Sequence, residues 1–275
     1  MQIVALEYHD IVDGATGEAA FEGSGFPGGA ARTYKMTATN FATHCDAVAT
    51  SGTLVVNDVR TLPTDVARCA MFTFDDGGVS ALRPTADILE RFGWRGHFFI
   101  TTGAIGTPGF LTTAQARELS DRGHVVGSHS HSHPVRMSHL DTAGLHREWR
   151  ESVECLQDAL GAAVTVASVP GGYYGTPVAK AAFAEGIRWL FTSEPVSRPS
   201  RVGECDVFGR YTLRIDSSPS LARALVSPGG TARLWQSAIW GAKKAAKRIG
   251  GDTYLRLRAS LMGDSRDSNR GALSP

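Results

Sequence analysis

Short apolar runs alternate with longer amphipathic segments along most of the chain. The short runs have the length of strands, and the longer segments carry apolar residues at helical spacing and end at Gly, Pro or capping residues. Strands are expected at 3–8, 67–74, 96–101, 124–128, 164–169, 187–193 and 211–215, and helices at 37–52, 84–93, 112–123, 141–160, 176–185 and 220–226. Repeated strand–helix units at this spacing predict an α/β fold with parallel strands, as a sheet or as a barrel.

Polar residues gather directly after four of these strands. The four clusters are Tyr8-His9-Asp10, Asp75-Asp76, Ser128 to His133, and Pro170 to Tyr174. In α/β barrels the catalytic groups sit at the C-terminal ends of the strands. We therefore expect the four clusters to meet at one mouth of the fold. His97, by contrast, falls within an expected strand and is predicted to pack without a catalytic role.

The composition excludes several classes of protein. The chain has 275 residues, of which 42% are hydrophobic and 20% charged, as is usual for a globular domain. It has no apolar run long enough to span a bilayer and no signal-peptide pattern at its N-terminus. The four cysteines lack CxxC spacing and are expected to be reduced thiols. These features predict a cytoplasmic protein without a nucleic-acid partner, and removal of an export signal is the alternative.

The adjacent carboxylates of Asp75 and Asp76 suggest two separate roles. Neighbouring residues at the end of a strand point in different directions, so one carboxylate can ligate a metal while the other faces a water. A DDGG sequence alone is more often a polar turn. The buried strand before it and the three alternating histidines at 129–133 favour a site. Two histidines and one carboxylate leave a zinc-like ion an open position, the usual arrangement for hydrolysis.

The stretch TFDDG at 73–77, followed by HSHSHP at 129–134, resembles the polysaccharide deacetylases of carbohydrate esterase family 4, the NodB-type domain. The resemblance covers roughly residues 1–226 and implies a distorted (β/α)7 barrel. It also implies that Asp75 is the catalytic base. Asp76, His129 and His133 are then the ligands of a divalent metal, with zinc favoured. His131 falls on the variable position of the second motif.

The chain departs from the usual third motif of that family. Val169 stands before PGGYYG where the family usually has an arginine nearby. The glycine-rich turn can still supply a backbone N–H to a developing oxyanion, and Gly171 and Gly172 are the candidates. Tyr173, next to them, is a candidate substrate contact.

A second departure concerns the general acid. No histidine follows His146, although the family usually presents a catalytic histidine late in the domain. The opening ALEYHDIV resembles the Tyr-His-Asp segment of exopolysaccharide deacetylases whose motif order is circularly permuted. This resemblance implies that His9 is the general acid, with Asp10 a candidate for orienting it. A buried structural histidine is the alternative for His9.

The C-terminal part differs in charge from the rest. From Thr231 to Pro275 nine Lys or Arg residues stand against three Asp or Glu residues. Within 232–251 an apolar stripe at helical spacing comprises Trp235, Ile239, Ala242, Ala246 and Ile249, with Lys243, Lys244, Lys247 and Arg248 beside or opposite it. The favoured interpretation is a helix whose stripe packs on the barrel. The alternative is attachment of 232–250 to an anionic membrane surface.

These observations predict a barrel domain over 1–228, a basic helical extension over 229–264 and a disordered tail over 265–275. The predicted function is a metal-dependent N-deacetylase acting on N-acetylated amino sugars of a glycan, glycoconjugate or lipid-linked sugar. One alternative keeps the mechanism but acts on another small amide or on an O-acetyl ester. The other is a catalytically inactive, glycan-binding relative. The oligomeric state does not follow from the sequence.

Overall fold

The computed structural model describes residues 1–13 and 21–242, and the predicted features at 243–275 lie outside these residues. One nine-stranded sheet runs in the order β11-β1-β4-β5-β6-β7-β8-β10-β9, and only β9 is antiparallel to its neighbour. The strands are β1 (Gln2–Tyr8), β4 (Arg68–Phe74), β5 (His97–Ile100), β6 (Val125–Ser128), β7 (Val166–Ser168), β8 (Trp189–Phe191), β9 (Ser200–Val202), β10 (Cys205–Phe208) and β11 (Arg210–Thr212).

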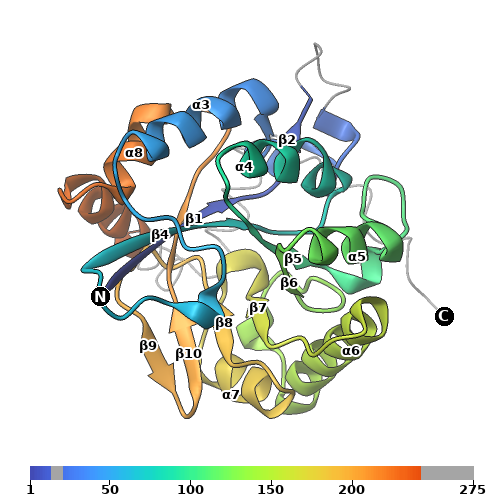
Figure 1. Ribbon diagram of the computed structural model, residues 1–275. Helices are drawn as coiled ribbons and strands as arrows, with labels where there is room; N and C mark the ends of the chain where they lie inside the picture. The colour runs from blue at the N-terminus through green and yellow to red at the C-terminus, as the bar shows by residue number, and fades with distance from the viewer. Residues whose placement is uncertain (14–20, 243–275) are drawn as a thin grey trace.

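Helices surround these strands (Figure 1). They include α2 (Gly29–Arg32), α3 (Ala38–Ala49), α4 (Asp87–Arg91), α5 (Thr113–Asp121), α6 (Thr142–Leu160), α7 (Thr176–Ala184) and α8 (Pro219–Val226), and a further helix over residues 231–242 follows α8. A small second sheet pairs β2 (Ile11–Val12) with β3 (Met36–Thr37). The predicted α/β class and the parallel strand arrangement are confirmed. No helix within 1–13 and 21–242 is both long and apolar enough to cross a membrane.

The segment after β8 makes the barrel irregular. The backbone N–H of Arg210 donates to Glu194 O, and that of Ile3 donates to Ser197 O, so this segment reaches the β11–β1 edge. Two of its neighbours, β9 and β10, were not predicted from the sequence, because these short strands flank a turn at Gly203 with a positive φ. The predicted helix at 84–93 is also divided, into a π-helical turn over Leu82–Ala86 and α4.

Residues at every second position of a strand point into the barrel, and their character changes along it. Near the start of the strands these positions are apolar and form a core cluster with Ile3, Ala5, Cys69, Met71, Phe99, Val125, Val166, Phe191 and Phe208. Two residues further along β1 and β4 the inward positions are Glu7 and Thr73, which lie side by side in the register. The same two-residue period then leads to His9 and Asp75. The strand period therefore delivers the polar residues to one end of the barrel.

His97 is a buried structural histidine, as predicted. Val59 N–H donates to its Nε2 at 3.0 Å, so Nδ1 carries the proton and donates to Phe72 O at 3.3 Å. Burial lowers the pKa of His97 to about 4. Protonation of Nε2 would remove the acceptor of the Val59 bond, so the fold requires the neutral imidazole.

His97 is therefore expected to make the fold sensitive to mild acid. Its pKa is about 6.5 in an unfolded chain and about 4 in the folded one. The stability that the neutral His97 contributes is fully present above the unfolded pKa. It is lost as the pH falls through the folded pKa, and the total loss of unfolding free energy is up to about 3 kcal/mol. Denaturant titrations from pH 7 to pH 4 should show a shallower loss of unfolding free energy in His97→Gln than in the wild type. Identical slopes would contradict this role.

Candidate active site

Five of the predicted site residues meet at the carboxyl ends of β1, β4 and β6. Asp76, His129 and His133 each present a ligand atom within 4.8 Å of the others, and so do Glu7, His9 and Asp75. Asp75 and Asp76 are adjacent in the chain, so the two groups share one mouth. The predicted convergence of strand-end clusters is thus seen for β1, β4 and β6.

The turn after β4 separates the two adjacent carboxylates. Asp76 has a φ of 74°, a left-handed conformation that costs a non-glycine residue energy and recurs at functional sites. Gly77 follows with a φ of 81°, and a Cβ there would lie 2.9 Å from the side chain of Ile100. Glycine is therefore required at 77, and the turn points Asp75 and Asp76 to different partners.

Asp76, His129 and His133 fit a divalent metal. Asp76 Oδ1 lies 3.5 Å from His129 Nε2 and 3.4 Å from His133 Nε2, and it is buried without a hydrogen-bond partner. Ligands at zinc distances in a tetrahedron are separated by about 3.3–3.5 Å. A buried carboxylate oxygen without a donor is costly unless a cation compensates it. The separations and the orphaned oxygen both agree with a resident ion.

Hydrogen bonds hold His129 with its Nε2 toward this group. Its Nδ1 donates to Ser168 Oγ at 2.6 Å, and that hydroxyl donates to Asp75 Oδ1 at 3.0 Å. This fixes the proton on Nδ1 and leaves the Nε2 lone pair for a metal. Burial lowers the pKa of His129 to about 4, which keeps the imidazole in its ligating, neutral form.

Asp75 is bound by an arginine that the sequence did not reveal. Arg210 Nη1 donates to Asp75 Oδ1 at 2.6 Å and Nη2 to Oδ2 at 2.7 Å, a bidentate pair in which the arginine is fully buried. Burial alone would raise the pKa of Asp75, but the guanidinium and His129 hold it well below its usual range. Asp75 therefore stays ionised, with both its oxygens hydrogen-bonded to Arg210.

Glu7 balances the other side of the guanidinium. Its Oε1 lies 3.0 Å from Arg210 Nη2 and accepts from Ser193 Oγ at 2.7 Å, while Oε2 accepts from Thr212 Oγ1. Glu7 is almost fully buried and lies in a strand whose other buried residues are apolar. A buried acid in such a strand needs a buried cation, and this was the signal that could have pointed to Arg210.

His9 lies beside Asp75, as the proposed acid must. Its Nδ1 is buried and has no hydrogen-bond partner, and its ring packs 4.7 Å from that of Tyr34. Asp10 does not orient it. The Asp10 carboxylate accepts from Ser24 Oγ at 2.6 Å and Ser80 Oγ at 2.9 Å instead, so that expectation was wrong. The residue next to His9 in the chain points to the other side, and the acids near His9 are Asp75 and Glu7, two positions away.

The remaining predicted residues lie in the turn after β7 and in the loop after β6. Gly171 and Gly172 form a turn with φ values of 66° and 67°, and a Cβ on Gly171 would collide with Val135 O. The ring of Tyr173 contacts the ring of His139 and the guanidinium of Arg136. His131 Nδ1 is hydrogen-bonded to the hydroxyl of Thr102 at 3.0 Å. His131 belongs to neither group of possible metal ligands. The oxyanion and substrate roles of the turn stay predictions.

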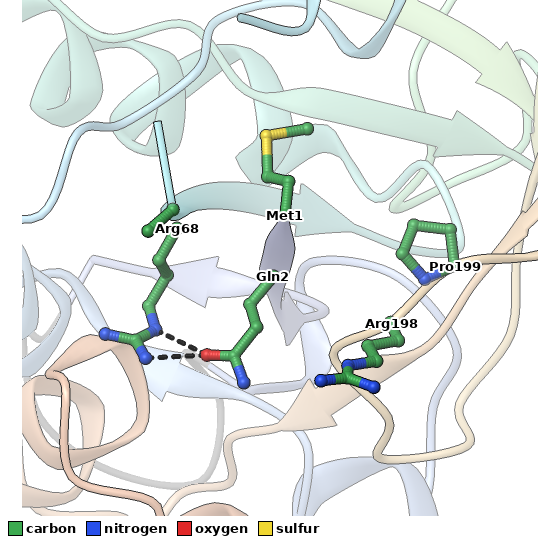
Figure 2. A pocket seen from close by; sticks show the side chains of 6 residues that line it. Met1, Gln2, Arg68, Arg198 and Pro199 are labelled. Atoms are coloured by element: carbon green, nitrogen blue, oxygen red, sulfur yellow. Dashed lines mark hydrogen bonds between the residues drawn. The ribbon is translucent and has the colours of Figure 1, made fainter. Parts of the chain in front are cut away.

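A hollow at the opposite end of the strands carries none of this chemistry. Figure 2 shows it at the first residues of β1 and β4, where Arg68 donates to Gln2 Oε1 at 2.9 and 2.6 Å. It is lined by Met1, Gln2, Ala67, Arg68, Arg198 and Pro199. None of these side chains is a carboxylate, imidazole or thiol. The candidate active site therefore lies at the carboxyl ends alone, within the described residues.

Comparison with known proteins finds a family similarity for the part of the chain that holds Asp75, Asp76, His129 and His133. The polysaccharide deacetylase family model matches residues 63–190, which hold both motifs. The provisionally named polysaccharide deacetylase YxkH of Bacillus subtilis (strain 168) is 27% identical over 128 residues, or 46% of each chain. A gellan lyase of a Bacillus species is 29% identical over 100 residues, 36% of this chain and 4% of that protein. The matches thus span less than half the length of either relative.

Solved structures share the fold over most of the chain. The deacetylase PplD of Streptococcus pyogenes, in complex with acetate, has a TM-score of 0.66 at 17% identity, covering 83% of this chain and 99% of that one. IcaB from Ammonifex degensii has a TM-score of 0.64 at 20% identity, covering 82% and 97%. A de-N-acetylase from Aggregatibacter actinomycetemcomitans has 0.63 at 18%, covering 79% and 97%. The barrel therefore extends well beyond the 63–190 match.

Removal of the Arg210 charge should strongly destabilise the fold. Arg210→Met keeps much of the side-chain volume but leaves Asp75 and Glu7 buried without a cation, a loss of about 3–5 kcal/mol. The control is Arg201→Met on β9, whose ion pair with Asp206 is largely exposed and contributes at most about 1 kcal/mol. Denaturant unfolding at pH 7 measures both variants. A similar, small loss in the two would show that the Arg210 pair does not stabilise the fold.

Proposed function

Residues 63–190 belong to the polysaccharide deacetylase family, and we propose that the chain is a metal-dependent N-deacetylase. The substrate is an N-acetylated amino sugar in a glycan or glycoconjugate, and the products are acetate and a free amine. One observation carries the proposal: Arg210 takes both oxygens of Asp75, while the neighbouring Asp76 turns an unpaired oxygen toward two imidazoles. A pair of carboxylates divided in this way supplies one base and one ligand.

Three residues are arranged to hold the ion. Asp76, His129 and His133 form a carboxylate and two-imidazole set, which suits zinc and leaves at least one position open. A divalent ion held there supplies Lewis acidity toward the amide oxygen and toward water. His133 also packs its ring 4.8 Å from that of Phe26, so an apolar wall borders one side of the set.

Asp75 is the base in this scheme. It accepts a proton from the water that attacks the acetyl carbonyl carbon, and Arg210 and Ser168 keep its carboxylate in one orientation. Backbone N–H groups of the Gly171–Gly172 turn are the candidates for stabilising the developing oxyanion. A non-catalytic glycan-binding domain has no need of a buried base fixed in this way.

His9 is the acid in this scheme. One of its ring nitrogens lies within 4.8 Å of a carboxylate oxygen of Asp75 and of Glu7, so the imidazole stands beside the base. The imidazolium then donates its proton to the amine nitrogen as the carbon–nitrogen bond breaks. Relatives of the same fold include a de-N-acetylase and a deacetylase bound to acetate, which supports this reaction class.

Asp75→Asn should remove activity without removing metal. The amide keeps the size of the side chain but cannot accept the water proton, so acetate release from N-acetylglucosamine oligomers should fall by about 10²–10⁴-fold. Zinc content, measured by mass spectrometry, should stay at the wild-type level. The matched variant Asp76→Asn should lose both zinc and activity. Full acetate release by Asp75→Asn would overturn the role of Asp75 as the base.

His9→Gln should discriminate between leaving groups. Amide cleavage needs a proton on the leaving amine, so acetate release from the amino sugar should fall by about 10²-fold or more. The leaving group of an aryl acetate ester is a phenolate, which departs without that proton. The hydrolysis rate of such an ester should therefore change only a few-fold. The control is His131→Gln, which should keep both activities. His131 lies between the candidate ligands His129 and His133 in the chain but belongs to neither group of possible metal ligands. Equal losses with both substrates would assign His9 another role.

A further inference from the structure

The last described helix, over residues 231–242, exposes three of its large apolar side chains. Leu234 is 70% exposed, Trp235 69% and Ile239 38%. Ala238 and Ala242, on the same side of the helix, are also exposed. The expectation that the stripe of Trp235, Ile239 and Ala242 packs on the barrel was therefore wrong. Residues Ala246 and Ile249 of that stripe lie outside the described part of the chain.

The barrel instead contacts the side of this helix that carries Arg233, Gln236, Ser237 and Trp240. Arg233 is buried, and its Nη1 donates to Leu225 O and to Ser227 O. Ser237 Oγ donates to Pro195 O at 2.5 Å, and Gln236 Nε2 donates to Thr212 O at 3.4 Å. These anchors recur at helical spacing, so one face of the helix is fixed. An ordinary amphipathic helix of a globular protein packs the other way round.

Such an arrangement needs a partner for the apolar face. Large exposed apolar residues that cluster, and that the fold does not require, mark interaction surfaces. Trp and Leu beside a cationic stretch suit the boundary between lipid headgroups and acyl chains. The sequence continues directly into Lys243, Lys244, Lys247 and Arg248, and 231–275 carries six more basic than acidic residues. This excess of positive charge is complementary to an anionic surface.

We propose that residues 231–242 dock the protein onto an anionic lipid surface, with Leu234, Trp235 and Ile239 in the headgroup region. The basic residues that follow contribute electrostatic attraction to the same surface. The inference does not depend on the deacetylase activity, since none of these residues belongs to the candidate active site.

The position of the helix gives this docking a consequence for the site. Trp240 lies against Gly172 in the turn after β7, since a Cβ on that glycine would be 3.1 Å from its ring. Gln236 bonds the backbone of Thr212, whose hydroxyl in turn bonds Glu7. The docking helix is thus built onto the rim of the active-site end. A surface-bound protein would hold that end near glycans attached to lipids.

The test uses the full chain and vesicles of phosphatidylcholine with or without phosphatidylglycerol. Co-sedimentation should show binding to the anionic vesicles that weakens with salt and little binding to phosphatidylcholine alone. Leu234→Ser/Trp235→Ser should reduce the partition coefficient by at least about tenfold. Lys243→Gln/Lys244→Gln should reduce it by about 25-fold, at about fivefold for each charge. The control is Leu54→Ser, which replaces a leucine that is 48% exposed and lies outside this helix.

Several outcomes would overturn the docking surface. The proposal would be overturned if the wild-type protein did not sediment with anionic vesicles. It would also be overturned if the serine double variant bound the vesicles like the wild type. A dimer in solution that the serine variant abolishes, without vesicle binding by the wild type, would assign the face to a second copy. Acetate release from soluble oligomers should be unchanged in all these variants, so failure of docking is distinguishable from failure of the proposed function.

Discussion

The buried guanidinium of Arg210 is the interaction on which the candidate site depends. It lies between two carboxylates, Asp75 and Glu7, and compensates charges that neither could carry alone inside the barrel. By occupying both oxygens of Asp75, it withdraws that residue from metal binding and leaves it ionised. Asp76, one position later, then has two imidazoles as its neighbours. In the proposed scheme, the different roles of Asp75 and Asp76 therefore follow from Arg210, which lies on a distant strand.

The alternation of strand residues explains how these groups reach one end of the barrel. Inward positions on β1 run from Ile3 and Ala5 to Glu7 and His9, and those on β4 run from Cys69 and Met71 to Thr73 and Asp75. The apolar layers form a packed floor, which excludes water from below the polar layer. Within that layer Asp75 and Glu7 are bound by Arg210 and by hydroxyl groups, whereas Asp76 Oδ1 has no hydrogen-bond partner. A low-dielectric floor strengthens the hydrogen bonds of Asp75 and Glu7 and keeps these two side chains in fixed positions.

Much of this could be predicted from the sequence, for identifiable reasons. The α/β class follows from the repeated strand–helix pattern, and the two histidines and two aspartates follow from motifs that are local in the chain. Arg210 was missed because its partner Asp75 lies 135 positions away and no local pattern joins them. The terminal helix was misjudged because an apolar stripe predicts which side chains share a face, but not which face the barrel holds. Arg233, Gln236 and Ser237 decided that through hydrogen bonds to backbone carbonyls.

The location of the metal tests the central claim most directly, because two groups of possible ligands lie side by side. Anomalous scattering at the zinc edge from crystals grown with zinc would locate the ion. The account predicts one ion within about 2.0–2.2 Å of Asp76 Oδ1, His129 Nε2 and His133 Nε2, with Asp75 still paired to Arg210. An ion bonded to Asp75, or held among Glu7, His9 and Asp75, would contradict it.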